Sequence, residues 1–201
     1  GGFRLRSGAQ NKDSSFGKIL KINLSNSKSE VISMGHRNPQ GLYFDEDNKY
    51  ILSSEHGAWG GDEINLIKIN EKEVQNFGWA QASYSEHYCG GKSGCLRKAY
   101  DKYPLLKSHE KNGYIEPLKY FTPSVAPSEI IKIKNKIYLL ATMKDKSIFI
   151  FSLNDKNKIN SINRIPIGER IRDVAVNNKS QEIYLSLENT TSIGVINISS
   201  L

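Results

Sequence analysis

Three hydrogen-bonding side chains, Arg37, Asn38 and Gln40, stand within four residues of one another just before an apolar, alternating run. An arginine guanidinium presents a planar fork of N–H groups that matches a carboxylate, and the two amides supply both donors and acceptors. We therefore interpret this segment as a candidate site for an anionic ligand.

A glycine-rich acidic segment, residues 55–65, follows shortly after it. Its backbone carbonyls and carboxylates suit a hard cation such as calcium. The acidic pair Asp62 and Glu63 could equally cap a loop, and both interpretations stay open. We expect His56 to orient the loop, because no second His or Cys is spaced for metal binding. We expect Trp59 to be a packing residue and not a sugar platform.

The composition is that of a soluble globular protein of 201 residues, with 38% hydrophobic and 24% charged residues. No apolar run approaches the roughly 20 residues that cross a bilayer, so we expect no stable membrane insertion. The net charge of +7 favours acidic partners. The lysines, however, alternate with acids and asparagines in turns, and no recognition motif is present, so we expect no nucleic-acid binding.

The chain begins Gly1-Gly2-Phe3-Arg4, without an initiator Met or a signal-peptide pattern. We expect it to be a fragment or a processed product. The only two cysteines, Cys89 and Cys95, flank a short glycine-rich loop. We expect a disulfide formed in an oxidising compartment, with free thiols as the alternative, because no zinc-type ligand spacing accompanies them.

The secondary structure is predicted to be all-β. Almost every apolar run is short, rich in β-branched or aromatic residues, and alternates with period two, as half-buried strands do. The clearest runs are 18–24, 40–45, 50–54, 63–67, 129–133, 136–140, 147–151, 172–176, 183–187 and 193–196. No segment shows a sustained helical stripe.

These runs repeat as strand, tight turn, strand, longer loop, strand, which is typical of β-propeller blades. In such a blade the loop before the innermost strand and the loop between the second and third strands lie at the same end. Residues far apart in sequence would then meet on one face near the propeller axis. The chain is too short for a closed ring of many blades, so we expect residues 1–201 to form a partial propeller whose N-terminal blades precede Gly1.

The order of the motifs resembles a known family. The chain is similar to the soluble aldose sugar dehydrogenases that use pyrroloquinoline quinone (PQQ), relatives of soluble quinoprotein glucose dehydrogenase. Six segments carry the resemblance in the family's order: 35–41, 55–65, 76–79, 123–128, 144–146 and 170–174. The resemblance implies a six-bladed propeller of which this chain covers roughly the C-terminal half.

The resemblance also implies roles for individual residues. The cofactor-binding residues would be Arg37, Asn38, Gln40, Lys144, Arg170 and Arg172. Guanidiniums suit the three carboxylates of PQQ, and a lysine suits a developing quinone oxyanion. A calcium ion on the quinone would be held partly by the backbone carbonyls of Gly57 and Ala58, and Glu63 with the carbonyl of Phe77 would match a second calcium site. The catalytic base, a histidine in the family, is expected upstream of residue 1, so no catalytic residue is assigned here.

The function expected from the resemblance is oxidation of the C1 hydroxyl of an aldose to a lactone, with PQQ and calcium as cofactors. The partners would be the sugar and an electron acceptor, either a quinone or a redox protein, and the location periplasmic or secreted. The 201-residue chain alone is expected to be inactive. The alternative is a non-catalytic β-propeller that binds a ligand or protein and has lost the catalytic base.

Overall fold

The computed structural model describes residues 7–69, 71–89 and 94–201. The strands form four β-sheets, ordered β1-β2-β6, β3-β4-β5-β7, β11-β10-β9-β8 and β12-β13-β14. The pairing is antiparallel except between β2 and β6. The strand bounds are β1 (Lys18–Ile22), β2 (Ser29–Met34), β3 (Pro39–Asp45), β4 (Tyr50–Glu55), β5 (Asp62–Lys68), β6 (Gln75–Asn76), β7 (Lys119–Phe121), β8 (Pro127–Lys134), β9 (Ile137–Thr142), β10 (Ser147–Leu153), β11 (Ile159–Pro166), β12 (Ile171–Asn177), β13 (Glu182–Leu187) and β14 (Ser192–Asn197).

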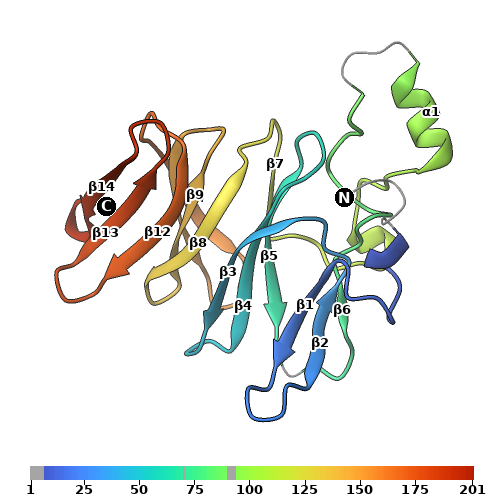
Figure 1. Ribbon diagram of the computed structural model, residues 1–201, viewed down its shortest axis with the longest axis horizontal. Helices are drawn as coiled ribbons and strands as arrows, with labels where there is room; N and C mark the ends of the chain where they lie inside the picture. The colour runs from blue at the N-terminus through green and yellow to red at the C-terminus, as the bar shows by residue number, and fades with distance from the viewer. Residues whose placement is uncertain (1–6, 70, 90–93) are drawn as a thin grey trace.

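The four sheets stand side by side in chain order, as successive blades of a propeller do (Figure 1). Hydrogen bonds between strands join these blades to one another. The Ser54 hydroxyl on β4 donates to the carbonyl oxygen of Ser128 on β8 at 3.3 Å. The Ser128 hydroxyl in turn donates to the carbonyl oxygen of Ile171 on β12 at 2.7 Å. The first strands of these three blades, β3, β8 and β12, also lie next to one another.

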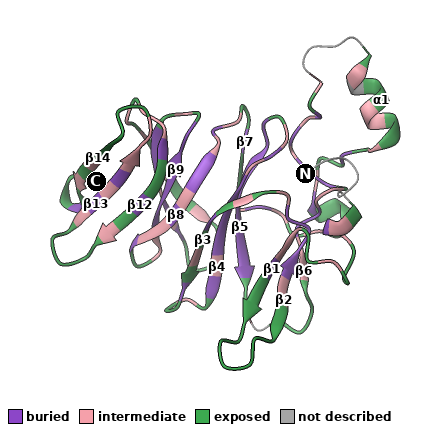
Figure 2. Cartoon of the chain, viewed as in Figure 1, coloured by how far each residue is buried: buried purple, intermediate pink, exposed green. Residues whose placement is uncertain are grey.

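Apolar cores fill the space between blades. One cluster, which includes Leu52, Ile130 and Phe151, joins the blade of β3–β5 to that of β8–β11. A second, which includes Leu139, Ile148 and Ile183, joins that blade to β12–β14. Burial is heaviest on β4, β5, β9 and β10, and the ends of β1 and β2 are exposed (Figure 2). Burial between sheets, and not within one sheet, holds the blades together.

The strands predicted from the sequence agree with the observed strands to within two residues at each end. Sequence reasoning missed β2, β6, β7 and β11. Strand β11 consists only of intermediate and exposed residues and has no buried side chain, so its apolar signal is weak. It also missed the helix α1 (Cys95–Lys102), whose eight residues are too few for a sustained helical pattern. No helix among the described residues is long and apolar enough to cross a membrane.

A buried polar network links β3 to β8 and β9. The Tyr138 hydroxyl donates to Asp45 Oδ2 at 2.5 Å and also lies 2.5 Å from the Tyr50 hydroxyl. Lys132 Nζ lies 3.0 Å from Asp45 Oδ1. Burial acts to raise the pKa of Asp45, but the hydrogen bonds from Tyr138, Lys132 and Asn48 outweigh it and lower the pKa to about 2.

This network predicts a stability loss in acid. Unfolded Asp45 takes up a proton near its ordinary pKa, about pH 4, whereas the folded residue stays charged until pH falls to about 2. The contribution of Asp45 is therefore complete above about pH 4 and disappears toward pH 2, a loss of about 2 kcal/mol. Urea unfolding of the unaltered protein and of Asp45→Asn, measured across this range, checks it. A stability difference between the two that does not shrink with falling pH would contradict the prediction.

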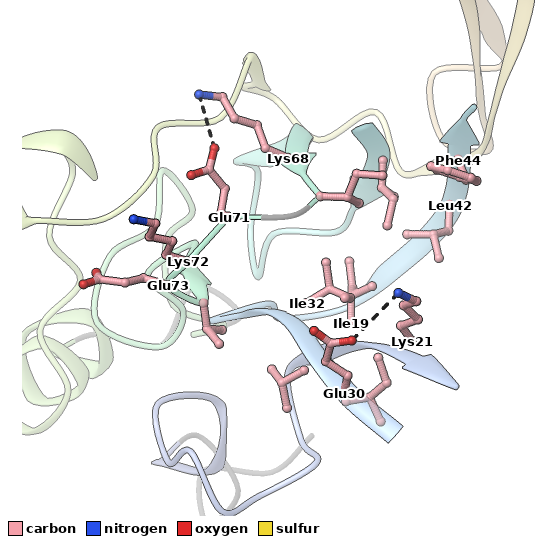
Figure 3. A pocket seen from close by; sticks show the side chains of 15 residues that line it. Ile19, Lys21, Glu30, Ile32, Leu42, Phe44, Lys68, Glu71, Lys72 and Glu73 are labelled. Atoms are coloured by element: carbon pink, nitrogen blue, oxygen red, sulfur yellow. Dashed lines mark ion pairs between the residues drawn. The ribbon is translucent and has the colours of Figure 1, made fainter. Parts of the chain in front are cut away.

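A cavity of about 680 Å³ lies away from the segments predicted to bind the cofactor. It is a groove between β1–β2 and β3, with Ile19, Ile32, Leu42 and Phe44 on its walls (Figure 3). Ion pairs stand at its rim, Lys21 with Glu30 at 3.9 Å and Lys68 with Glu71 at 3.8 Å. Leu42 and Phe44 are half exposed there. The groove lacks a convergent set of polar groups that could orient a small molecule, so the functional site is sought elsewhere.

Candidate functional site

One backbone hydrogen bond recurs in three blades at the same end of the sheets. The N–H of His56 donates to the carbonyl of Asn38 at 3.1 Å, that of Met143 to Ala126 at 2.8 Å, and that of Glu188 to Arg170 at 2.9 Å. Each bond joins the loop before a blade's first strand to the loop after its second strand. These loops carry Arg37, Asn38, Lys144 and Arg170, and Gln40 and Arg172 are each the second residue of a first strand. The expectation that these residues lie at one end of the blades agrees with the observed topology.

The same loops are also tied from blade to blade, and the buried carboxylate of Asp62 makes the strongest link. Asp62 Oδ1 accepts from the N–H of Gly57 at 2.9 Å. Asp62 Oδ2 accepts from the Ser124 hydroxyl at 2.7 Å and from the N–H groups of Val125 and Ala126 at 2.8 and 2.7 Å. The sequence left open whether Asp62 binds a cation or caps a loop, and these hydrogen bonds show that it caps a loop. It fixes the glycine-rich loop against the loop before β8.

Arg170 and Arg172 come together on the edge of the β12–β14 blade. Both guanidiniums reach the sulfur of Met143, at 3.8 and 3.1 Å, and Met143 directly precedes Lys144. Both also pair with the carboxylate of Glu188, at 2.9 Å for Arg170 Nε and 2.6 Å for Arg172 Nε. These two ion pairs lower the pKa of Glu188. Two guanidiniums share one carboxylate, so this group of three side chains has a net positive charge, which suits an anionic ligand.

Arg37 lies in a different setting, because its guanidinium contacts the glycine-rich loop and two aromatic rings. Arg37 Nη1 donates to the carbonyl of His56 at 2.8 Å. Its guanidinium carbon is 5.4 Å from the ring centre of Trp79 and 5.8 Å from that of Tyr88. These cation–π contacts fix the plane of the guanidinium. Arg37 shares an end of the blades with the Arg170–Arg172 pair, but its contacts are with the loop after β4 and with two rings that follow β6 in the chain.

The two predicted amide residues pair with each other. Gln40 Nε2 donates to Asn38 Oδ1 at 3.0 Å and to the carbonyl of Pro39 at 3.1 Å. Both side chains are exposed. Lys144 is exposed as well, and its backbone N–H donates to the carbonyl of Val125 at 3.0 Å. A ligand would therefore meet these three side chains from the solvent side.

Three of the four residues predicted to hold metal gather around a small cavity. Gly57, Glu63 and Phe77 line it together with Arg37 and Glu55; Ala58 is not among its lining residues. A methyl group on Gly57 would stand 2.0 Å from the carbonyl oxygen of Gly60 and 2.6 Å from that of Gly61, so only glycine fits. The loop is thus packed with oxygen atoms around a position that no side chain can fill.

Two buried carboxylates face each other beside this cavity. Glu55 and Glu63 are partners across β4 and β5, and the amide of Asn65 donates to both, at 3.0 and 3.3 Å. Burial and the neighbouring charge of Glu55 raise the pKa of Glu63 well above its usual range. Burial also acts to raise the pKa of Glu55, but His36 and the N–H groups of Arg37 and Asn38 hold it lower.

The side chains around Glu55 and Glu63 have the chemistry that a calcium ion requires. The buried oxygen Asn65 Oδ1 and both ring nitrogens of His109 make no hydrogen bond within the described structure. A carboxylate pair with an unpartnered amide oxygen is an oxygen-rich set that a hard cation would satisfy. No three His, Cys, Asp or Glu side chains converge as a metal centre in the described ranges. A cation here would therefore also need backbone and amide oxygens.

Comparison with known proteins gives the family. The sequence pattern of the family described as "Glucose / Sorbosone dehydrogenase" matches residues 1–194 of the chain. The chain belongs to the glucose/sorbosone dehydrogenase family. This confirms the resemblance inferred from the six sequence segments.

Relatives and solved structures of this family agree with the fold. An aldose sugar dehydrogenase of Escherichia coli is 31% identical over 163 residues, which are 76% of this chain and 40% of that protein. The crystal structure of the soluble aldose sugar dehydrogenase from Escherichia coli superimposes with a TM-score of 0.73 at 23% identity, covering 94% of this chain and 56% of that one. The PQQ-bound form of an aldose sugar dehydrogenase from Streptomyces coelicolor gives 0.65 at 24% identity, covering 93% and 50%.

These matches confirm the all-β propeller fold, and the chain spans about half the length of the glucose/sorbosone dehydrogenases that it matches. Sequence reasoning missed Glu188, the partner of both arginines. The hairpin register could have shown it, because Leu187 at the end of β13 pairs with Ile171 on β12, between the two arginines. The packing role expected for Trp59 is wrong: its side chain is 62% exposed, because the glycine-rich loop holds it outside the core.

Proposed function

We propose that the protein is a PQQ-dependent aldose sugar dehydrogenase that oxidises the C1 hydroxyl of an aldose to a lactone with the help of calcium. The observation that carries the proposal is the meeting of Arg170 and Arg172 at Met143, next to Lys144. This cationic group lies at the same end of the blades as the oxygen-lined loop. A polyanionic cofactor and a divalent cation need such neighbours.

Each residue would have a separate task in the site. Arg170 and Arg172 would pair with cofactor carboxylates through the N–H groups that Glu188 leaves available. Arg37 would offer a guanidinium held in place by Trp79 and by the carbonyl of His56. Lys144, on its exposed side, would stabilise negative charge that develops on an oxygen during the reaction. Asn38 and Gln40 would donate hydrogen bonds at the rim.

The bound PQQ would supply an ortho-quinone that accepts the hydride from the sugar. The carbonyls of Gly57 and Ala58 would hold a calcium ion near that quinone, and Glu63 with the carbonyl of Phe77 would hold a second. Glu55 and Glu63 at the cavity support the second site, because Asn65, whose amide donates to both carboxylates, has a buried oxygen that makes no hydrogen bond in the described structure. Asp62 would keep the loop rigid, so that a ligand does not have to order it.

We further propose that the blades needed to complete the ring, and a histidine that takes the hydroxyl proton, lie upstream of residue 1. A periplasmic or secreted location is part of the same proposal. The disulfide between Cys89 and Cys95 supports it, since disulfides persist in oxidising compartments. An electron acceptor, either a quinone or a redox protein, would reoxidise the cofactor.

Reconstitution tests the proposal directly. The full-length apoprotein, supplied with PQQ and calcium, is expected to reduce an artificial electron-accepting dye only when an aldose is present. Omission of calcium or its chelation should lower the rate, and a sugar without a free C1 hydroxyl should give none. A protein that binds PQQ but reduces no dye with any aldose would instead be the non-catalytic binding propeller.

A further inference from the structure

Two exposed aromatic side chains stand together beside the glycine-rich loop. Trp59 is 62% exposed and Tyr88 is 61% exposed. Their ring centres are 6.2 Å apart with the planes at 88°, so the two rings make an open corner. Large exposed aromatic side chains lose the stabilisation that burial would provide, so an exposed pair held in a fixed arrangement indicates a binding surface.

Backbone pairing places the two rings side by side. Trp59 and Glu86 form an antiparallel bridge, in which the N–H of Glu86 donates to the carbonyl of Trp59 at 3.0 Å. Tyr88 is two residues further along and so lies near the indole. This hydrogen bond fixes the backbone of Trp59, and the indole ring itself faces outward.

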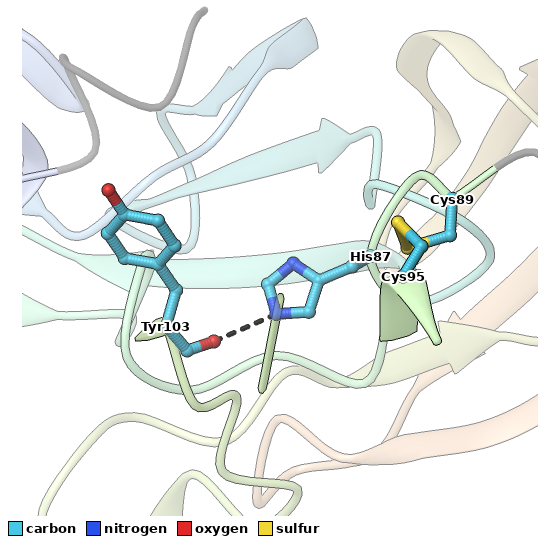
Figure 4. The surroundings of a disulfide bond; sticks show 4 residues. All are labelled: His87, Cys89, Cys95 and Tyr103. Atoms are coloured by element: carbon cyan, nitrogen blue, oxygen red, sulfur yellow. Dashed lines mark hydrogen bonds between the residues drawn. A yellow bond between two sulfur atoms is a disulfide. The ribbon is translucent and has the colours of Figure 1, made fainter. Parts of the chain in front are cut away.

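Residues on both sides of Tyr88 anchor it. The buried ring of His87 is bonded to the carbonyl of Tyr103, with Nε2 at 2.8 Å from the oxygen, and meets Tyr100 edge to face at 4.8 Å. On the other side Cys89 forms a disulfide with Cys95 at the start of α1 (Figure 4). The exposed tyrosine is therefore pre-positioned, which lowers the entropy cost of binding a ligand.

The surroundings of the corner are polar and adjoin the proposed cofactor site. The Arg37 guanidinium lies 5.8 Å from the Tyr88 ring. Trp59 is two residues from Gly57. The residue after Trp59, Gly60, lies near Thr122: a methyl group added to Gly60 would be 3.6 Å from the Thr122 side chain. Glu86 and Lys107 form an ion pair at 2.8 Å nearby. Apolar ring faces beside groups that bond hydroxyls match a pyranose, which has an apolar C–H face and polar edges.

We propose that Trp59 and Tyr88 form a sugar-binding platform for a pyranose ring beyond the one that is oxidised. This rests on the proposed function. The oxidised ring must lie over the cofactor, whereas the platform is at the exposed rim, so it contacts the second ring of a disaccharide. Two rings among charged groups are too little apolar surface for the core of a protein interface, which buries about 800 Å² on each partner.

Kinetics with matched sugars test the platform. In the full-length holoenzyme, Trp59→Ala is expected to raise KM for maltose about tenfold, with kcat unchanged and KM for glucose altered less than about twofold. Tyr88→Ala also removes a ring contact of Arg37, so its expected effect is a rise in KM for maltose about tenfold larger than any rise in KM for glucose. Trp59→Phe should restore most of the maltose affinity. Phe16→Ala, which removes another exposed aromatic ring outside the site, should change neither sugar.

A binding measurement separates this inference from the proposed oxidation. Methyl maltoside has no free C1 hydroxyl and cannot be oxidised there, so calorimetric titration reads binding alone; Trp59→Ala should weaken it about tenfold as well. If the unaltered protein oxidises no aldose, the proposed reaction is wrong. If Trp59→Ala still loses methyl maltoside binding in that case, the platform is supported independently of the reaction. Oxidation of aldoses with an unchanged preference between maltose and glucose in both alanine variants would overturn the platform. A slower reaction with a protein acceptor alone would make the corner an acceptor surface and also overturn it.

Discussion

The double variant Arg170→Ala/Arg172→Ala is expected to bind PQQ about a hundred-fold to ten-thousand-fold more weakly than the unaltered protein. Each charge-assisted hydrogen bond contributes roughly 1.5–3 kcal/mol, so two of them amount to about 3–6 kcal/mol. Arg172 is about half exposed, and solvent there places the expected loss toward the lower end. Glu188, released from both guanidiniums, adds an unpaired negative charge that repels the cofactor and acts in the same direction.

Fluorescence titration of the full-length apoprotein with PQQ measures this loss. Arg97→Ala is the matched control, since it removes an exposed arginine from α1 and should leave the dissociation constant unchanged. Glu188→Gln keeps a hydrogen-bonding side chain but removes the competing charge, and it is informative when combined with the single arginine variants. A double variant with undiminished PQQ affinity would remove these arginines from the cofactor site.

The variant Asp62→Ala is expected to lower the free energy of unfolding by about 3–5 kcal/mol, the range for breaking a buried charged network. Asp62 is 1% exposed and accepts from three backbone N–H groups and one hydroxyl. Alanine leaves these donors buried without partners. Asp62→Asn, which keeps one side-chain oxygen as an acceptor, should fall between alanine and the unaltered protein.

Urea unfolding of the full-length protein measures the effect. Asp155→Ala serves as the control, because Asp155 is fully exposed and forms a surface ion pair with Lys136, so its unfolding midpoint should not move. A loss below about 1 kcal/mol for Asp62→Ala would show that water replaces the carboxylate and that the two loops are not held by it.

Much of the fold follows from local pattern. Period-two alternation located the strands with fully buried centres, such as β4 and β9, because burial on one or both faces leaves a clear apolar signal. The repeat of these strands predicted the propeller. Strand β11 and helix α1 gave weak signals, since one buries little and the other is short. Tertiary pairing, and not local propensity, determines where such segments lie.

The site was predictable in part, and the reason differs between residues. Guanidiniums at the start of a strand are visible in sequence, and the blade topology indicates that they share one end of the sheets. Glu188 was missed because its role depends on the register of β13 against β12. Trp59 was assigned to the interior because most tryptophans are buried on average, and the sequence does not show that its loop faces outward.

The three matching backbone bonds, from His56 to Asn38, from Met143 to Ala126 and from Glu188 to Arg170, have a kinetic meaning. Each bond joins the two loops of a blade at their base before any ligand binds, so the loop end of the propeller is preorganised. A ligand would then bind a preformed site. Its association rate would depend on diffusion and electrostatic attraction, and not on a slow closing motion of the loops.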